Sequence, residues 1–574
     1  MARLILLSLW LTCAVYWVHA APAPTAKPAL AGCGAAMKSG AEKGDKDEAK
    51  PDGFAAGQVW SDGSVTVDGE AIPYCAVAGT LVVHPKDWDD SANAIESGKT
   101  EQDDADKNPT AQASMFYVAY FKRVGSPRPL TFLFNGGPGA ATVWLHMGAF
   151  GPKRVDTADA IHAPAAPYRL VNNDKSLLDS SDLVFIDAPG TGFSRIAGNG
   201  KDAAFYGVDE DVHAFAHFIV GFLTKYKRWN SPKYLFGESY GTTRAAVLAA
   251  KLQATPGIDF NGVIMLSQVL ATHVYPDRPE ATPGNDLPYQ MGLPTYAAAA
   301  WYHSQPRDKP PGDIPASLLN EVERFAMGDY ASALASGGLL EPARREEIIG
   351  KLHDYTGLSV EYLRRADLRV SADQFRQELL RDRGLIVGET DTRYRGYTLD
   401  RMDKKAGYDP TDAAITSAYV STFNDYARRV LNYTDTKAYR PDVRDIADKW
   451  RFTHEQPGGA DGSVTTDSSL NVLPDLARAM KYNPLLKVQL NAGYYDLVTP
   501  YLQGKYEMSH LPIPQELRGN IEYRCYQAGH MVYLRPDARA QLHDNVAEFI
   551  DRTSNLPPRP KAARAVRPGC AGPS

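Results

Sequence analysis

Three residues of the sequence have the types that nucleophilic acyl transfer requires, and all three lie close to glycines. Ser239 is the centre of "GESYG", Asp496 ends "NAGYYD", and His530 follows a glycine in "AGHM". A serine hydroxyl is a weak nucleophile, so it needs a base to accept its proton, and the base needs an acid to orient it. We therefore expect Ser239 to be the nucleophile, His530 the base and Asp496 the orienting acid.

The surroundings of Ser239 predict a sharp turn between a strand and a helix. The apolar stretch 233–236 precedes it, and a helical pattern follows from Thr242. Such a turn strains the backbone, needs small neighbours and leaves the hydroxyl at a helix N-terminus. An ordinary serine between two glycines remains the alternative on the motif alone. The other histidines are less well placed as the base: His303 and His454 lie in the expected insertion, His510 precedes a loop proline, and His543 falls within the expected final helix.

A second glycine-rich loop, "NGGPGA" from Asn135 to Ala140, follows another apolar stretch. Glycines there allow backbone N–H groups to approach a substrate oxyanion, and Asn135 adds a side-chain donor. A turn that needs positive φ angles is the alternative explanation for this loop by itself.

Short apolar segments alternate with helical ones along much of the chain. This alternation predicts a parallel sheet covered by helices on both faces, with ligands bound at the carboxyl ends of its strands. The expected parallel strands are 130–134, 182–187, 233–236, 260–268, 485–493 and 520–529. The expected helices are 209–226, 242–254 and 536–550. Segments 64–84 and 113–123 alternate in polarity and predict antiparallel strands, with a turn at Asp68-Gly69.

Composition and local character divide the chain into six expected regions. Residues 1–20 have a short basic start, an apolar run and small residues before Ala20, which predicts a secretory signal peptide and an exported protein. An uncleaved membrane anchor is the alternative. The other expected regions are a flexible leader 21–52, a core 53–270, a helical insertion 271–467, a second core part 468–555 and an irregular tail 556–574.

The overall composition excludes some partners and leaves others open. Hydrophobic residues make up 44% of the 574 residues, and the net charge of −6 comes without a long basic run, so nucleic acid is not an expected partner. After signal cleavage we expect no membrane contact, and we expect no metal or other cofactor. The oligomeric state stays open.

Four cysteines remain once the expected signal peptide is removed: Cys33, Cys75, Cys525 and Cys570. An even number in an exported protein suits two disulfides, with three possible pairings. We expect Cys33 to pair with Cys570, since each lies close to a terminus. Free buried thiols are the alternative.

The motifs "NGGPGA", "DAPGTGFS", "GESYG", "NAGYYD" and "AGHM" resemble, in the same order, those of the serine carboxypeptidases, the family of carboxypeptidase Y and cathepsin A, and look most like bacterial members. Taking the resemblance together with the segment patterns above, we expect an α/β-hydrolase fold with a large, mainly helical cap insertion and an N-terminal antiparallel strand extension. The resemblance implies an exopeptidase that acts on peptides through an acyl-enzyme. By motif, Ser239, Asp496 and His530 match the triad, Gly137 and Tyr240 the oxyanion-hole donors, and Asn135 and Glu238 the groups that hold the substrate carboxylate.

A carboxylate beside Glu238 would be repelled unless the two groups share a proton, which predicts peptide hydrolysis that is best at acidic pH. Three positions depart from the family's usual residues. Leu133 stands in place of Trp, Ala140-Ala141-Thr142 in place of Cys-Ser-Ser, and Ala149 close to where a second Glu is usual. These changes leave fewer polar groups for a substrate carboxylate. An esterase, acyltransferase or other exopeptidase on the same fold, or a catalytically silent binding protein, therefore remain alternatives.

Overall fold

The structure is a computed structural model, and it describes residues 54–88, 109–123, 127–274, 282–303, 312–458, 466–467, 469–557 and 570. The expected signal peptide, the leader and most of the tail lie outside these residues. Within the described part of the chain, none of the helices combines the length and the apolar character needed to span a bilayer.

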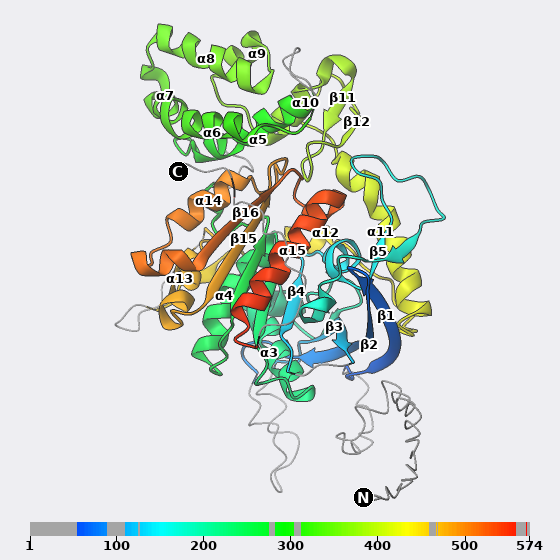
Figure 1. The fold of residues 1–574 in the computed structure, drawn as a ribbon. Coiled ribbons are helices and arrows are strands. Elements are labelled where there is room, and N and C mark those ends of the chain that lie inside the picture. Colours follow the sequence, from blue (N-terminus) through cyan, green and yellow to red (C-terminus); the bar gives the residue numbers. More distant parts are fainter. Residues whose placement is uncertain are drawn as a thin grey trace, which may run out of the picture.

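One large mixed sheet organises the described part of the molecule (Figure 1). Its strands follow the order β1-β2-β3-β7-β4-β9-β10-β15-β16, and β8 pairs with β3. Their bounds are β1 (Gln58–Val67), β2 (Glu70–Val83), β3 (Gln112–Lys122), β4 (Leu130–Phe134), β7 (Asp182–Ile186), β8 (Arg195–Ala197), β9 (Lys233–Glu238), β10 (Gly262–Leu266), β15 (Lys487–Gly493) and β16 (Ile521–Tyr526).

The sheet has an antiparallel end and a parallel end. Strands β1, β2, β3 and β7 pair antiparallel, and from β7 to β16 each neighbouring pair is parallel. The parallel strands are apolar along their length because helices bury both faces: Phe132 and Phe134 face one core cluster, and Leu133 faces the other. This arrangement is the α/β-hydrolase fold, as the sequence motifs predict, and the antiparallel hairpin at 58–83 is also confirmed.

Helices cover the sheet on both sides. One core cluster packs α3 (Val208–Lys225), α4 (Tyr240–Ala254) and α13 (Leu473–Tyr482) against one face. The other packs α11 (Pro410–Arg429) and α15 (Pro536–Thr553) against the opposite face. The short helices α2 (Lys201–Phe205) and α12 (Arg444–Asp448) lie in the connections. Helix α4 begins directly after β9, so its N-terminus lies at the same edge of the sheet as the carboxyl ends of the parallel strands.

The predicted helical insertion is present, and its first part has a core of its own. This part lies above the sheet in Figure 1 and consists of α5 (Leu287–Tyr302), α6 (Ala316–Phe325), α7 (Ala331–Ser336), α8 (Pro342–Thr356), α9 (Val360–Arg365) and α10 (Ala372–Glu378). Tyr495 and Leu497, on either side of Asp496, are buried in the same cluster. The insertion therefore packs directly on a loop that carries a predicted catalytic residue.

Small two-stranded ribbons and one further α-helix complete the strands and α-helices of the described residues. The ribbons pair β5 (Lys153–Val155) with β6 (Leu170–Asn172), β11 (Leu385–Val387) with β12 (Arg395–Tyr397), and β13 (His454–Glu455) with β14 (Thr466–Asp467). Helix α14 (Tyr501–Ser509) follows the Asp496 loop and contacts α5.

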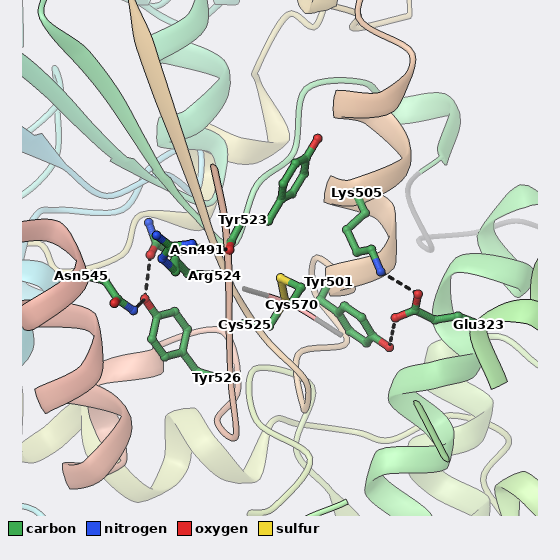
Figure 2. Close-up of a disulfide and its surroundings, with 10 residues drawn as sticks. All are labelled: Glu323, Asn491, Tyr501, Lys505, Tyr523, Arg524, Cys525, Tyr526, Asn545 and Cys570. Atoms are coloured by element: carbon green, nitrogen blue, oxygen red, sulfur yellow. Dashed lines mark hydrogen bonds and ion pairs between the residues drawn. A yellow bond between two sulfur atoms is a disulfide. The ribbon is translucent and has the colours of Figure 1, made fainter. Parts of the chain in front are cut away.

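Cys570 forms a disulfide with Cys525 on β16, and the expected Cys33–Cys570 pairing is therefore wrong (Figure 2). Cys75 is also disulfide-bonded, and Cys33 lies outside the described residues. Closeness to a terminus in sequence does not fix distance in space: Cys570 follows α15, yet its Cα lies 4.6 Å from that of Cys525 at the edge of the sheet. The disulfide fastens the end of the chain to the strand that leads to His530.

A buried histidine joins α3 to α13. The two ring nitrogens of His454 lie 2.7 Å from Asp209 Oδ1 and 2.9 Å from Asp475 Oδ2. Burial alone would lower the pKa of His454, but the two carboxylates outweigh burial and raise the pKa to about 9. The imidazolium form donates to both acids at once.

This contact predicts a specific pH dependence of stability. The pKa of His454 rises from 6.5 to about 9 on folding, so its contribution is full below pH 6.5 and is lost as the pH rises towards 9. We expect His454→Gln to lower the free energy of unfolding by about 2 kcal/mol at pH 6 and by much less at about pH 9.5. Urea unfolding of both proteins at the two pH values measures this difference. His162→Gln, at an exposed position, is the control, and an equal loss at both pH values would contradict the prediction.

Candidate active site

Ser239 occupies a strained turn between β9 and α4. Its φ and ψ angles are 60° and −131°, a conformation that few residues other than glycine adopt. A Cβ on Gly237 would overlap the backbone of Gly241, and a Cβ on Gly241 would lie 2.7 Å from the carbonyl oxygen of Phe134. Both glycines are therefore required by the turn, which is the geometry that the sequence predicts for an exposed nucleophile.

The ends of β9, β10 and β16 bring Ser239 close to His530. The Ser239 N–H donates to the carbonyl oxygen of Leu266 at 2.9 Å. Ser267, which follows Leu266 in the chain, donates its hydroxyl to the carbonyl oxygen of His530 at 2.7 Å. Among the described residues, no hydrogen bond joins Ser239 Oγ to His530 Nε2, and in unliganded enzymes such catalytic contacts are often long.

His530 and Asp496 form a buried hydrogen-bonded pair. His530 Nδ1 lies 2.8 Å from Asp496 Oδ2, and Asp496 is fully buried. Thr499 donates its N–H to Asp496 Oδ1 at 2.9 Å and its hydroxyl to Oδ2 at 2.8 Å. The carboxylate is therefore fixed in place, and it holds the imidazole with Nδ1 as the donor and Nε2 free to act as a base.

Three carboxyl groups act on His530. Burial alone would lower the pKa of His530, but Asp496, Glu238 and Asp412 outweigh burial and raise it. Asp412 lies in the first turn of α11 and is exposed to solvent. The protein that packs around part of the Asp412 side chain and the neighbouring Asp409 raise its pKa to about 7, although solvent still reaches the residue. No sequence motif pointed to Asp412, because its helix is distant in sequence from each of the motifs.

The glycine loop after β4 lies directly on the Ser239 turn. A Cβ on Gly136 would overlap Tyr240 N and lie 2.8 Å from Gly241 N and from the carbonyl oxygen of Glu238. The adjacent Gly137 has φ = 104°. The backbone N–H groups of Gly137 and Tyr240 are predicted to form the oxyanion hole. This close approach places them on adjacent segments of backbone beside Ser239.

Asn135 and Glu238, the predicted carboxylate-binding pair, are buried and contact each other. The Oδ1 atom of Asn135 accepts the Leu145 N–H at 3.1 Å, so its amide N–H groups are left to face Glu238. The Tyr533 hydroxyl lies 3.1 and 3.0 Å from the two oxygens of Glu238. Burial raises the pKa of Glu238 to about 7, although His530, Tyr533 and Asn135 each favour the charged form.

Tyr533 and Arg244 are two further residues that the sequence analysis missed. Arg244 is fully buried on α4, and its guanidinium binds both oxygens of Asp211 at 2.7 and 3.2 Å. The same guanidinium donates to the carbonyl oxygen of Asn135 at 2.9 Å. Arg244 thus ties the Asn135 loop to the helix that begins after Ser239. The signal for Tyr533 was its place three residues after His530, within "GHMVYLRP".

Comparison with known proteins gives evidence on the family that does not depend on the geometry of the site. The family model described as "Serine carboxypeptidase" matches residues 97–270, a range that includes the Asn135 loop and the Ser239 turn. The chain is 28% identical over 149 residues to the pheromone-processing carboxypeptidase KEX1 of Yarrowia lipolytica, covering 26% of this chain and 22% of that protein. It is 27% identical over 164 residues to the carboxypeptidase sxa2 of Schizosaccharomyces pombe, covering 28% and 30%.

Over residues 97–270 the chain is therefore similar to the serine carboxypeptidase family. It spans less than a third of the length of either relative. Among solved structures, VinJ is 14% identical with a TM-score of 0.31, over 80% of this chain and 99% of that one. A proline iminopeptidase from Mycobacterium smegmatis is 12% identical with a TM-score of 0.29, over 86% and 99%. The fold assignment rests on the sheet order and the Ser239 turn.

Proposed function

We propose that this protein is an active serine carboxypeptidase, which releases C-terminal amino acids from peptides through an acyl-enzyme. The observation that supports this most is the position of the buried Asn135–Glu238 pair next to the Ser239 turn and the Asp496–His530 pair. A triad alone fits many hydrolases. A buried carboxyl with a pKa of about 7 beside it suits a substrate that brings a carboxylate of its own.

In the proposed mechanism, Ser239 Oγ attacks the carbonyl carbon of the last peptide bond. His530 Nε2 takes the hydroxyl proton, and the N–H groups of Gly137 and Tyr240 stabilise the oxyanion. His530 then gives the proton to the leaving amine, and the free amino acid departs. Water, deprotonated by His530, attacks the acyl-enzyme and releases the shortened peptide.

Asn135 and protonated Glu238 would hold the substrate carboxylate during the first step. A neutral carboxyl donates a hydrogen bond, whereas an ionised one repels a second carboxylate. The same requirement would explain hydrolysis that is best at acidic pH. We further propose that the protein is exported, which its predicted signal peptide and the Cys525–Cys570 disulfide support.

The test compares an N-blocked dipeptide with its C-terminal amide between about pH 5 and about pH 7, a range in which Glu238 is still protonated and His530 becomes able to accept a proton. We expect the free acid to be cleaved with a kcat/KM about 100-fold higher than the amide, because only the acid can bind both Asn135 and Glu238. Ser239→Ala is the control for contaminating peptidases. Equal cleavage of acid and amide would retain the triad and reject the carboxylate site, in favour of an esterase, acyltransferase or other exopeptidase.

A further inference from the structure

A loop of the helical insertion is hydrogen-bonded to both of the loops that carry the acid and the base. We call residues 388–394, which connect β11 to β12, the bridging loop. The carbonyl oxygen of Thr390 accepts the backbone N–H of His530 at 2.6 Å. The carbonyl oxygen of Glu389 accepts the backbone N–H of Leu497 at 3.0 Å. Thr392 donates its N–H to the carbonyl oxygen of Tyr495 at 2.9 Å. The bridging loop therefore bonds to both neighbours of Asp496 and to His530 itself.

Side chains reinforce this backbone contact. Asp391 is fully buried, and its Oδ2 accepts the N–H of Gly529, the residue before His530, at 3.2 Å. A Cβ on Gly529 would overlap Asp391, so the glycine that precedes the predicted base is needed to admit the bridging loop. Burial of Asp391 in this position requires a positive partner.

Arg393 supplies that positive charge and extends the contact to the core. Its guanidinium binds Asp391 at 2.6 to 3.1 Å and Asp159 at 2.9 and 3.1 Å, and its side chain is 1% exposed. Asp159 lies between β5 and β6, in the part of the chain that precedes Ser239. One arginine thus connects the insertion, the His530 loop and the first half of the core.

We propose that Asp391 and Arg393 are positioning residues, which hold the His530 and Asp496 loops in register for proton transfer from Ser239. The proposal rests on the proposed triad. The insertion would then have a role in the chemical step, in addition to any role in covering the substrate. Proton transfer depends on sub-ångström placement of donor and acceptor, so a loosened bridging loop would slow the chemical step more than it would weaken substrate binding.

The experiment replaces Arg393 in the full-length chain and measures two rates. The first is the labelling of Ser239 by a fluorophosphonate, which needs the triad but no peptide substrate. The second is hydrolysis of the N-blocked dipeptide, resolved into kcat and KM. For Arg393→Met we expect the labelling rate and kcat to fall together by about 10- to 100-fold, with KM changed by less than about threefold.

Arg369→Met is the matched control, because Arg369 binds Asp286 through two hydrogen bonds of 2.8 and 3.0 Å within the same insertion. Its labelling rate should stay within about twofold of wild type. If Arg393→Met does not fold, Asp391→Asn replaces it, because asparagine keeps an acceptor for Gly529 and removes only the charge. We expect about a fivefold loss of labelling rate in Asp391→Asn.

The outcomes separate this proposal from the proposed function. Wild-type labelling of a folded Arg393→Met or Asp391→Asn protein overturns the positioning role. If the variants are labelled more slowly but the wild-type protein cleaves no peptide, the positioning role is retained and the proposed carboxypeptidase activity is rejected. A wild-type protein that the probe does not label rejects both.

Discussion

Replacing Asp496 with asparagine is expected to lower kcat by about 10⁴-fold with little change in KM. The structure gives the reason. The Thr499 N–H donates to one oxygen of Asp496, so in the variant the amide oxygen takes that place and the NH₂ group faces His530 Nδ1. Nδ1 must then accept a hydrogen bond, which puts the imidazole proton on Nε2. In that tautomer His530 cannot take a proton from Ser239.

Steady-state kinetics and the fluorophosphonate labelling rate measure this effect side by side. Both should fall, because both need a base at Nε2. Asp313→Asn is the control, since Asp313 forms a partly exposed ion pair with Arg535 at 2.7 Å and contacts neither His530 nor Asp496 among the described residues. A kcat within about tenfold of wild type for Asp496→Asn would remove Asp496 from the proposed triad.

Local sequence patterns were sufficient for the sheet and for the motifs on its edge. The strand over 130–134 and the helix after Ser239 are confirmed, because each has an apolar period and a glycine turn within a few residues. The proposed roles of Ser239, Asp496 and His530 remain predictions, but the structure places these residues in one region. They are far apart along the chain, yet each follows a strand of the parallel part of the sheet, and the carboxyl ends of such strands lie at one edge.

Contacts between distant segments could not be predicted in this way. Asp391 and Gly529 are separated by 138 residues, and neither lies in a periodic pattern that points to the other. The glycine before His530 was visible in the sequence, but the reason for it was the close approach of the bridging loop. The disulfide was missed for a related cause, because the position of Cys570 depends on how the chain returns to β16 after α15.

The pH dependence of peptide hydrolysis should depend on Glu238. Burial raises the pKa of this carboxyl from 4.5 to about 7. The groups that face it include His530 and Asp496, with Tyr533 and Asn135 in contact. Above pH 7 the ionised side chain repels the carboxylate of a peptide, so we expect kcat/KM for the N-blocked dipeptide to fall about tenfold for each pH unit. An ester without a free carboxylate should not show this loss.

Glu238→Gln separates the carboxyl's titration from that of the base. Glutamine keeps a hydrogen-bond donor and has no proton to lose, so the alkaline decline for the dipeptide should disappear. The acidic limb should remain, because it reflects protonation of His530, whose pKa is raised by Asp496. A decline that persists in Glu238→Gln would show that another group controls it, and Asp412, with a pKa of about 7, is the first one to replace.

Stability provides a substrate-free check on the same carboxyl. A raised pKa means that the contribution of Glu238 to stability is full below pH 4.5 and is lost as the pH rises through about 7. At pH 8 the wild-type protein carries a buried charge that Glu238→Gln lacks. The variant should therefore unfold in urea with a free energy about 2–3 kcal/mol higher than wild type at pH 8, and the two should be equal near pH 4. Above pH 7 the ionised Glu238 carboxyl therefore lowers the stability of the wild-type protein. If Glu238→Gln gains stability and also loses the preference for the free acid, we infer that the protein tolerates this lower stability because Glu238 binds the substrate carboxylate.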